Sequence, residues 1–209
     1  MNVLLFGASG GIGREVRQQA LAAGHQLVLF ARNPSALEPI TDRERVIEGD
    51  IADAILVGDA LAGVDGVVSV LGPTSNTKDQ VALFETFAQT LVAAMGAHGV
   101  RRVVTISGGA VDVAGDRKSL RARIVSAMVR RIVPHVVQAK QRELDVLAAS
   151  DLEWVAPRPP RVVEGPATGR YVVGNGAKGL RITQGDLAQF IVRQLTEDDY
   201  LRQAPFVSN

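Results

Sequence analysis

A glycine-rich turn between an apolar run and an amphipathic stretch constrains this chain more than any other feature. Residues 3–6 are apolar, residues 7–13 read Gly-Ala-Ser-Gly-Gly-Ile-Gly, and residues 14–23 follow a helical pattern. A strand, a glycine turn and a helix in this order present backbone N–H groups and the positive end of a helix dipole to a pyrophosphate. The spacing G-x-x-G-x-x-G departs from the G-x-G-x-x-G fingerprint, but its position between strand and helix favours dinucleotide binding. The residues expected to hold the pyrophosphate are Gly7, Ser9, Gly10, Gly11, Ile12 and Gly13.

Strand-like and helix-like segments alternate along the chain. The strand candidates are short β-branched runs, as expected for strands buried on both faces of a parallel sheet. They lie at residues 3–6, 26–30, 46–48, 66–70, 103–106 and 152–156. Helical patterns lie at 13–23, 54–61, 81–98, 120–149 with a break at Pro134, and 186–195. This alternation predicts an α/β fold of the Rossmann type, with a doubly wound parallel sheet. We expect one domain over residues 1–209, with a Gly/Pro-rich segment at about 157–185 on the substrate side.

Composition narrows the possible functions. The chain has no cysteine, so it has no disulfide, catalytic thiolate or zinc–thiolate site. Its net charge of +1 argues against a general nucleic-acid binder. His25, His98 and His135 have no metal-ligand spacing, so no metal site is expected. No apolar run is long enough for a membrane span, and the start does not read as a signal peptide, so we expect a cytoplasmic protein without a membrane partner.

The end of the second predicted strand bears on the choice of dinucleotide. An acidic residue at this place binds the ribose 2′-OH in NAD sites, but here Arg32 occupies it. A guanidinium matches a 2′-phosphate through paired, charge-assisted hydrogen bonds, which favours NADPH over NADH. The alternative is that Arg32 is a solvated loop arginine. After the third strand, Asp50 and Ile51 are expected to border the adenine, although Asp50 could instead cap the helix that begins near Ala54.

The carboxyl ends of the fourth and fifth strands are expected to carry the reactive part of the site. Leu71 and Gly72 would approach the ribose and nicotinamide, and Pro73 would contact the substrate. Ser107 would sit beside the nicotinamide, unless it is a turn serine that satisfies local backbone groups. Lys140 is an isolated cation that either faces the cofactor or is a solvated helix lysine.

The tyrosine of ordinary short-chain dehydrogenases is missing. Those enzymes place a Tyr-x-x-x-Lys pair after the serine, with the tyrosine as proton donor. The tyrosines of this chain are Tyr171 and Tyr200, and neither is followed by lysine four residues later. Standard alcohol-dehydrogenase chemistry is therefore not expected.

These motifs resemble the atypical short-chain dehydrogenases, including the NAD(P)H-binding, NmrA-like proteins. The resemblance rests on the glycine turn and on residues 31–34, 49–50 and 105–107. Residues 152–155, 158–161, 165–171, 186–188 and 195–200 look like the biliverdin IXβ reductase/flavin reductase group. The resemblance implies NADPH-dependent hydride transfer to flavins or linear tetrapyrroles by a monomeric Rossmann fold without the tyrosine donor.

The resemblance also implies roles for individual residues. Ser107 matches a serine beside the nicotinamide, and Pro159 and Pro160 match paired prolines that line that pocket, Pro159 toward the cofactor and Pro160 toward the substrate. Arg161 and Lys140 stand where the reductases have histidines. These cations suit an anionic substrate but leave proton delivery to solvent, because lysine is a poor acid at neutral pH unless its pKa is lowered.

The basic stretch 117–131 does not resemble the biliverdin IXβ reductase/flavin reductase group. It is either a solvated helix face or a lid whose cations attract an anionic substrate.

The sequence thus predicts an NADPH-dependent reductase of a planar acceptor such as a flavin, a linear tetrapyrrole or a quinone, acting as a monomer or weak homodimer. The alternatives are an NmrA-like NADP(H) sensor that acts through a protein partner, and a relative of the sugar-nucleotide epimerases and reductases.

Overall fold

A parallel sheet forms the centre of the molecule. The computed structural model describes residues 1–37, 41–176 and 179–209. Within them, six parallel strands are ordered β3-β2-β1-β4-β5-β6. The strands are β1 (Asn2–Phe6), β2 (Gln26–Ala31), β3 (Glu44–Glu48), β4 (Gly66–Ser69), β5 (Arg102–Thr105) and β6 (Glu153–Val155). The order reverses between β1 and β4, so the crevice at their carboxyl ends is the switch point where such folds bind ligands.

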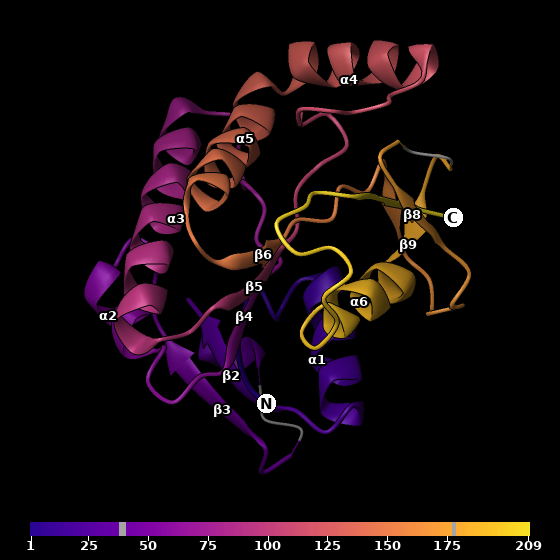
Figure 1. Ribbon diagram of the computed structural model, residues 1–209. Helices are drawn as coiled ribbons and strands as arrows, with labels where there is room; N and C mark the ends of the chain where they lie inside the picture. Colours follow the sequence, from indigo (N-terminus) through magenta and orange to yellow (C-terminus); the bar gives the residue numbers. More distant parts are fainter. Residues whose placement is uncertain (38–40, 177–178) are drawn as a thin grey trace.

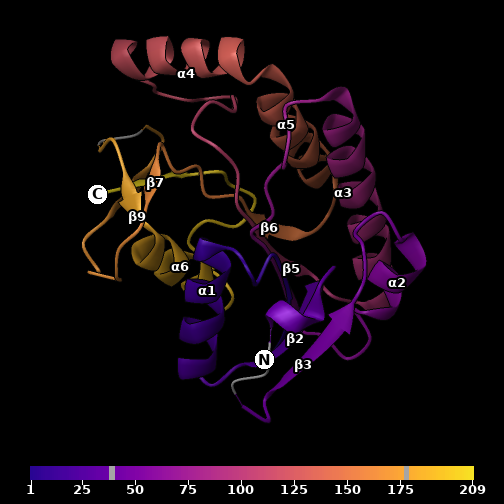
Figure 2. The same ribbon diagram turned by 180° about the vertical axis from the view of Figure 1, so that it is seen from behind.

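Helices cover both faces of the sheet (Figures 1 and 2). On one face α1 (Gly11–Ala22) packs against α6 (Gln184–Arg193). On the other face lie α2 (Ala54–Asp59), α3 (Lys78–His98) and α5 (Pro134–Ala149), with α3 and α5 packed together. The doubly wound α/β fold expected from the sequence is therefore confirmed.

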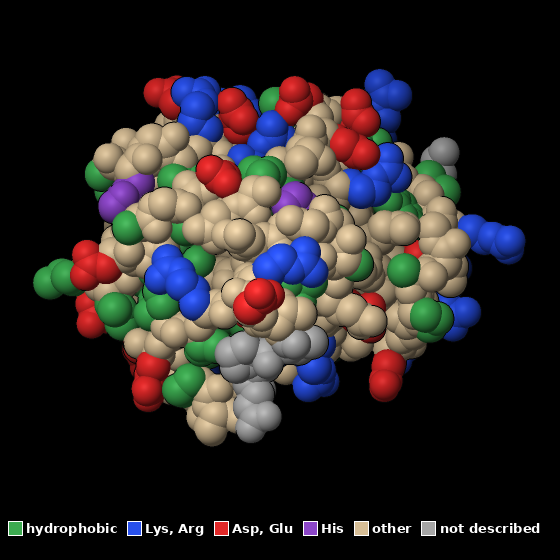
Figure 3. All heavy atoms as spheres, turned by 90° about the horizontal axis from the view of Figure 1, so that it is seen from below, with side chains coloured by type: hydrophobic (Ala, Val, Ile, Leu, Met, Phe, Trp, Pro, Cys, Tyr) green, Lys and Arg blue, Asp and Glu red, His purple; other side chains and the backbone are tan. Residues whose placement is uncertain are grey.

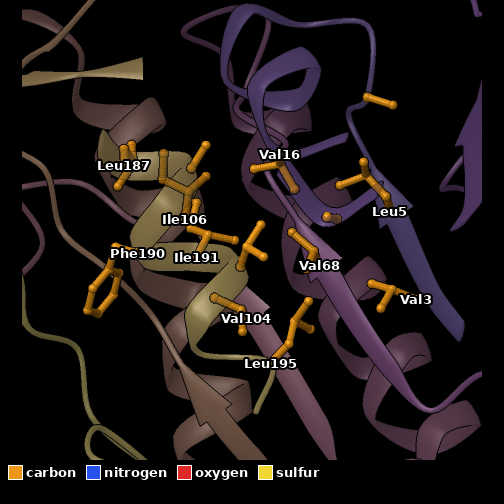
Figure 4. Close-up of a cluster of buried hydrophobic side chains, with 14 of the residues drawn as sticks. Val3, Leu5, Val16, Val68, Val104, Ile106, Leu187, Phe190, Ile191 and Leu195 are labelled. Carbon is orange, nitrogen blue, oxygen red and sulfur yellow. The ribbon is translucent and has the colours of Figure 1, made fainter. Parts of the chain in front are cut away.

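Alternate residues of β1 enter the two halves of the core. Val3 and Leu5 belong to the cluster that packs beneath α1 and α6 (Figure 4). Leu4 and Phe6 belong to the cluster beneath α2, α3 and α5. Because successive strand residues point to opposite faces, a continuous apolar run is what a strand covered on both sides requires.

The expected break at Pro134 separates two helices. Helix α4 (Leu120–Ile132) ends one residue before the Val133–Pro134 junction, and α5 begins at Pro134. Pro is tolerated at the first position of a helix but would disrupt the interior of a longer one. The side chain of Asn76 accepts hydrogen bonds from the backbone N–H groups of His135 and Val136 at 2.9 and 3.4 Å, and so caps α5 from another loop.

The C-terminal part contains short strands that the sequence did not predict. They are β7 (Val162–Val163), β8 (Val172–Gly174), β9 (Ile182–Thr183) and β10 (Phe206–Ser208), with β7 paired to β9 and β8 to β10. A 3-10 turn, η1 (Pro34–Ala36), follows β2. None of the helices in the described ranges has the length and apolar character needed to cross a membrane.

Candidate functional site

The glycine turn has the geometry that close approach of a phosphate needs. Gly7 has a φ of +88°, a conformation that L side chains rarely adopt. A Cβ on Gly13 would clash with the Gly7 carbonyl oxygen, so this residue must be glycine for α1 to begin against the end of β1. Gly10 is the N-cap of α1 and offers no capping side chain, and the first turn has no acidic residue. The amides at this helix start are therefore left for an external acceptor.

A groove runs from the glycine turn along the carboxyl ends of β1, β2 and β3. Its volume is about 230 Å³. It is lined by seven of the predicted cofactor residues, namely Gly7, Ser9, Arg32, Asp50, Ile51, Leu71 and Gly72. Arg32 is exposed, and its guanidinium has no hydrogen-bond or ion-pair partner within residues 1–37, 41–176 and 179–209. The predicted adenosine side of the site thus forms one continuous surface.

Asp50 lies in this groove but does not cap the following helix. Its carboxylate accepts a hydrogen bond of 2.9 Å from the N–H of Ala52. The N-cap of α2 is Asp53, whose carboxylate accepts from the N–H groups of Ile55 and Leu56 at 3.1 and 3.0 Å. The alternative interpretation of Asp50 as the cap is therefore wrong, because Asp53 is the residue that directly precedes the helix.

Ser107 follows β5, and its hydroxyl is buried without a partner. The backbone N–H of Ser107 donates to the Pro157 carbonyl at 2.9 Å, but no hydrogen bond to its Oγ exists among the described residues. A buried hydroxyl without a partner is costly, so an external group that completes its hydrogen bonding would stabilise the site.

Lys140 is buried rather than solvated. Its Nζ donates to the Leu71 carbonyl at 3.1 Å and forms an ion pair with Glu143 one helical turn away. Thr105 Oγ1 donates to Glu143 at 2.6 Å, so the carboxylate is held from β5 as well. The Lys140 Nζ also lies 5.2 Å from the centre of the Phe84 ring. The expectation that Lys140 could be a solvated helix lysine is wrong.

A second and larger cavity begins at Lys140. Its volume is about 620 Å³, and six valines and two prolines contribute to its wall. The predicted residues Lys140, Pro159, Pro160 and Arg161 line it, and α4 contributes Arg121, Val125 and Val129. Part of the basic stretch 117–131 therefore does cover a cavity, on the side that also carries Arg161.

Some predicted site residues lie elsewhere. Among the described residues, Pro73 and Ser107 line neither cavity. Gly10, Gly11, Ile12 and Gly13 form the start of α1 beside the groove rather than its wall. Tyr171 and Tyr200 both pack against Phe190 of α6, with ring centroids 6.2 and 5.6 Å away. The tyrosines are thus partly buried side chains that pack against the core beside α6.

The structure adds residues that the sequence analysis missed. Phe84 and Gln80 of α3 line the groove, and the end of the Gln184 side chain packs against Gly11, so a Cβ there would require Gln184 to move. The buried pair of Thr105 and Glu143 also went unnoticed, although the i, i+3 spacing of Lys140 and Glu143 was visible in the sequence. Glutamate side chains are usually exposed, and the burial of Glu143 depends on both Thr105 of β5 and Lys140 of its own helix.

Arg158 was also missed as a structural residue. It is fully buried, and its guanidinium forms two hydrogen bonds to the Asp116 carboxylate, at 2.7 and 2.5 Å. Its other donors bind the carbonyls of Val111 and Ala204. Arg158 therefore anchors the loop that leads from β5 into α4.

These features fit a nicotinamide dinucleotide. The glycine turn leaves backbone amides for the pyrophosphate, and Arg32 contributes to the groove a cation that has no partner among the described residues. The Ser107 hydroxyl lines neither the groove nor the second cavity, but it is buried without a hydrogen-bond partner among the described residues. Within the described residues, no group of three or more His, Cys, Asp or Glu side chains could hold a metal ion.

Comparison with known proteins supports this conclusion. The profile of the NAD(P)H-binding family matches residues 7–198, which is most of the chain. The match confirms the predicted nicotinamide cofactor and the resemblance to atypical short-chain dehydrogenases. Cinnamoyl-CoA reductase 1 of Oryza sativa subsp. japonica is 33% identical over 124 residues, which cover 55% of this chain and 37% of the rice protein. The chain spans little more than a third of the curated relatives it matches.

Solved structures share the fold over the full length. An anaerobilin reductase from Escherichia coli O157:H7 is 22% identical, with a TM-score of 0.80 and coverage of 100% of this chain and 97% of that one. A short-chain dehydrogenase/reductase from Veillonella parvula, solved with NADP, is 17% identical, with a TM-score of 0.79 and coverage of 100% and 94%. At these identities the likeness concerns the fold alone.

Proposed function

The chain belongs to the NAD(P)H-binding family, and from this premise we propose that it is an NADPH-dependent reductase of a flat, conjugated acceptor such as a flavin. The observation that carries the proposal is the second cavity, which adjoins the cofactor groove at Lys140. Its volume of about 620 Å³ lies within the usual range of small-molecule sites. Its apolar walls suit an aromatic ring system, and Arg121 and Arg161 suit anionic substituents.

The choice of NADPH rests on Arg32. Its guanidinium, which has no partner in the described part of the chain, directly follows β2, where a 2′-phosphate would gain paired, charge-assisted hydrogen bonds. A neutral 2′-hydroxyl gains much less from the same group. The glycine turn would hold the pyrophosphate, and the Ser107 hydroxyl would bind the nicotinamide end.

The side chains around the junction act mainly by orientation. When bound, the nicotinamide supplies a hydride, and the reduced acceptor takes its remaining hydrogen as a proton from water. Lys140 holds the Leu71 carbonyl and is itself held by Glu143, so it fixes the wall between groove and cavity. Correct placement of two reactants can account for roughly 7–11 kcal/mol of a barrier. A site of this kind needs no tyrosine donor, and we expect it to accept several planar compounds.

The test is NADPH oxidation with FMN, riboflavin and a quinone, together with binding titrations of NADPH and NADH. We expect turnover of at least one acceptor and tighter binding of NADPH. NADPH binding without turnover of any acceptor would reject the reductase and favour the sensor. Equal affinity for the two dinucleotides would reject the role of Arg32.

A further inference from the structure

Helix α4 has an apolar edge that nothing in the described chain covers. Val125 and Val129 line the second cavity, but Leu120, Ile124, Met128 and Ile132 recur every four residues along an outer edge. Their side chains are exposed by 74, 57, 57 and 66%. In Figures 1 and 2 the helix projects at one end of the molecule, beyond the body formed by the sheet and its helices. Large apolar side chains grouped in this way mark an interaction surface.

The same end of the molecule carries cations without counterions. Arg117, Arg121, Arg123 and Arg131 are exposed, and their guanidinium groups have no partner among the described residues. Helix α4 contains no acidic residue, and the nearby Asp112 is already bound to Lys118 and Arg130. The opposite end, shown in Figure 3, mixes acidic and basic side chains. A chain with a net charge of only +1 thus concentrates unpaired positive charge beside its exposed apolar edge.

We propose that α4 docks on an anionic lipid surface, with its outer edge inserted at the boundary between headgroups and acyl chains and its arginines on the lipid phosphates. A helix with an exposed apolar edge, several arginines and no acidic residue is suited to interfacial binding on anionic lipid. Charge decides against a second copy of the chain as the occupant. Two copies packed edge to edge would bring Arg121, Arg123 and Arg131 against the same residues, whereas anionic lipid attracts every one of them.

The surface also lies at the rim of the second cavity. Val125 and Val129 of α4 line one side of this cavity, and Leu180 and Arg161 line it from the C-terminal part. Leu180 is 62% exposed. Each side of the cavity therefore combines apolar residues with an arginine, which is Arg121 on α4 and Arg161 on the C-terminal part. Docking through α4 would turn this rim toward the lipid. The docking needs no turnover and stands apart from the proposed reductase activity, and it departs from the sequence expectation that the protein has no membrane partner.

The experiment is co-sedimentation of the full chain with vesicles of phosphatidylcholine, with and without roughly one third phosphatidylglycerol. We expect binding to the anionic vesicles only, and weaker binding at about 0.15 M salt than at low ionic strength. The R123Q/R131Q variant loses the attraction of two arginines to the anionic surface, so it should bind the vesicles roughly 30-fold more weakly. The I124S/M128S variant should bind more than about 10-fold more weakly, because it removes apolar side chains from the inserted edge.

Matched controls lie on other elements. Ile55 of α2 is 79% exposed, and Arg142 is an exposed arginine of α5, so I55S and R142Q should bind like the unchanged protein. Equal loss in the control variants, or equal binding to neutral vesicles, would overturn the proposal. Absence of vesicle binding would also overturn it. A dimer seen by light scattering that I124S/M128S dissociates, without vesicle binding, would identify a second copy as the occupant instead.

Discussion

The buried pair of Lys140 and Glu143 allows a stability prediction that also tests the site. The side chains of Lys140 and Glu143 are 8 and 4% exposed. In the Lys140→Met variant, Glu143 keeps the hydrogen bond from Thr105 but loses the only cation paired with it among the described residues. Breaking a buried pair on one side costs about 3–5 kcal/mol, because a charge is left uncompensated. This is a large part of the roughly 5–15 kcal/mol by which typical domains are stable.

The double variant K140M/E143M should recover most of this loss. It removes both charges, and apolar replacement of a whole buried pair is often neutral or stabilising. The four proteins of the cycle, unfolded in urea and followed by circular dichroism, should give a coupling energy of about 3 kcal/mol or more. The exposed lysine of α3 offers the control, since K78M should change stability by less than about 0.5 kcal/mol.

Two results would refute this reasoning. One is a loss below about 1 kcal/mol in K140M, and the other is a double variant as unstable as the sum of the single variants. The same double variant separates stability from function. If it is folded and binds NADPH but reduces flavin slowly, the charge of Lys140 acts on the reaction and not only on the fold.

Three further outcomes are expected. Arg32→Ala should raise the KM for NADPH roughly 10- to 100-fold and leave the KM for NADH nearly unchanged, because a charge-assisted pair contributes about 1.5–3 kcal/mol. An equal rise in the KM for both cofactors would argue against a 2′-phosphate contact. Asn76→Ala should lower the free energy of unfolding by about 1 kcal/mol through loss of the α5 cap, whereas Ser75→Ala, at the exposed neighbouring residue, should change it little. Burial raises the pKa of Asp186, but hydrogen bonds from Thr168 and Gly169 outweigh it and hold the pKa below its usual value. The contribution of the Asp186 carboxylate to stability is therefore present above about pH 4 and is lost as the pH falls through the folded-state pKa. Asp186→Asn should lower the free energy of unfolding by about 1–3 kcal/mol at neutral pH. In this variant the free energy of unfolding should also depend less on pH in the acid range.

The sheet and the glycine turn were predictable because their signals are local. The apolar run of β1 requires a strand that is covered on both faces. Position 13 requires glycine because any side chain there would clash with the Gly7 carbonyl oxygen. Pro134 likewise ends one helix and begins another through its own covalent geometry. Such features depend on neighbouring residues in the chain, so the sequence displays them.

The features that the sequence did not predict correctly depend mostly on contacts with distant parts of the chain. The Asp50 alternative is an exception, because Asp53 directly precedes the helix start at Ala54 and could have been identified as the cap from the sequence. The strands β7 to β10 have two or three residues each and exist through pairing with distant segments. Burial of Glu143 depends on Thr105 of a neighbouring strand and on Lys140 of its own helix. Tertiary contacts of this kind leave little trace in local sequence patterns.

A hydrogen bond between Lys140 and Leu71 links the linings of the two cavities, and this has a consequence for specificity. Leu71 lines the groove, its carbonyl accepts the hydrogen bond from Lys140, and Lys140 lines the second cavity. The residue expected to select the dinucleotide, Arg32, follows β2, whereas the walls of the second cavity come mainly from α4, α5 and the loops after β5 and β6. Because these elements differ, changes in α4 would alter the acceptor of the proposed reductase without altering its cofactor. In that reductase, hydride transfer would depend on the Lys140–Leu71 contact, which fixes the position of one cavity relative to the other.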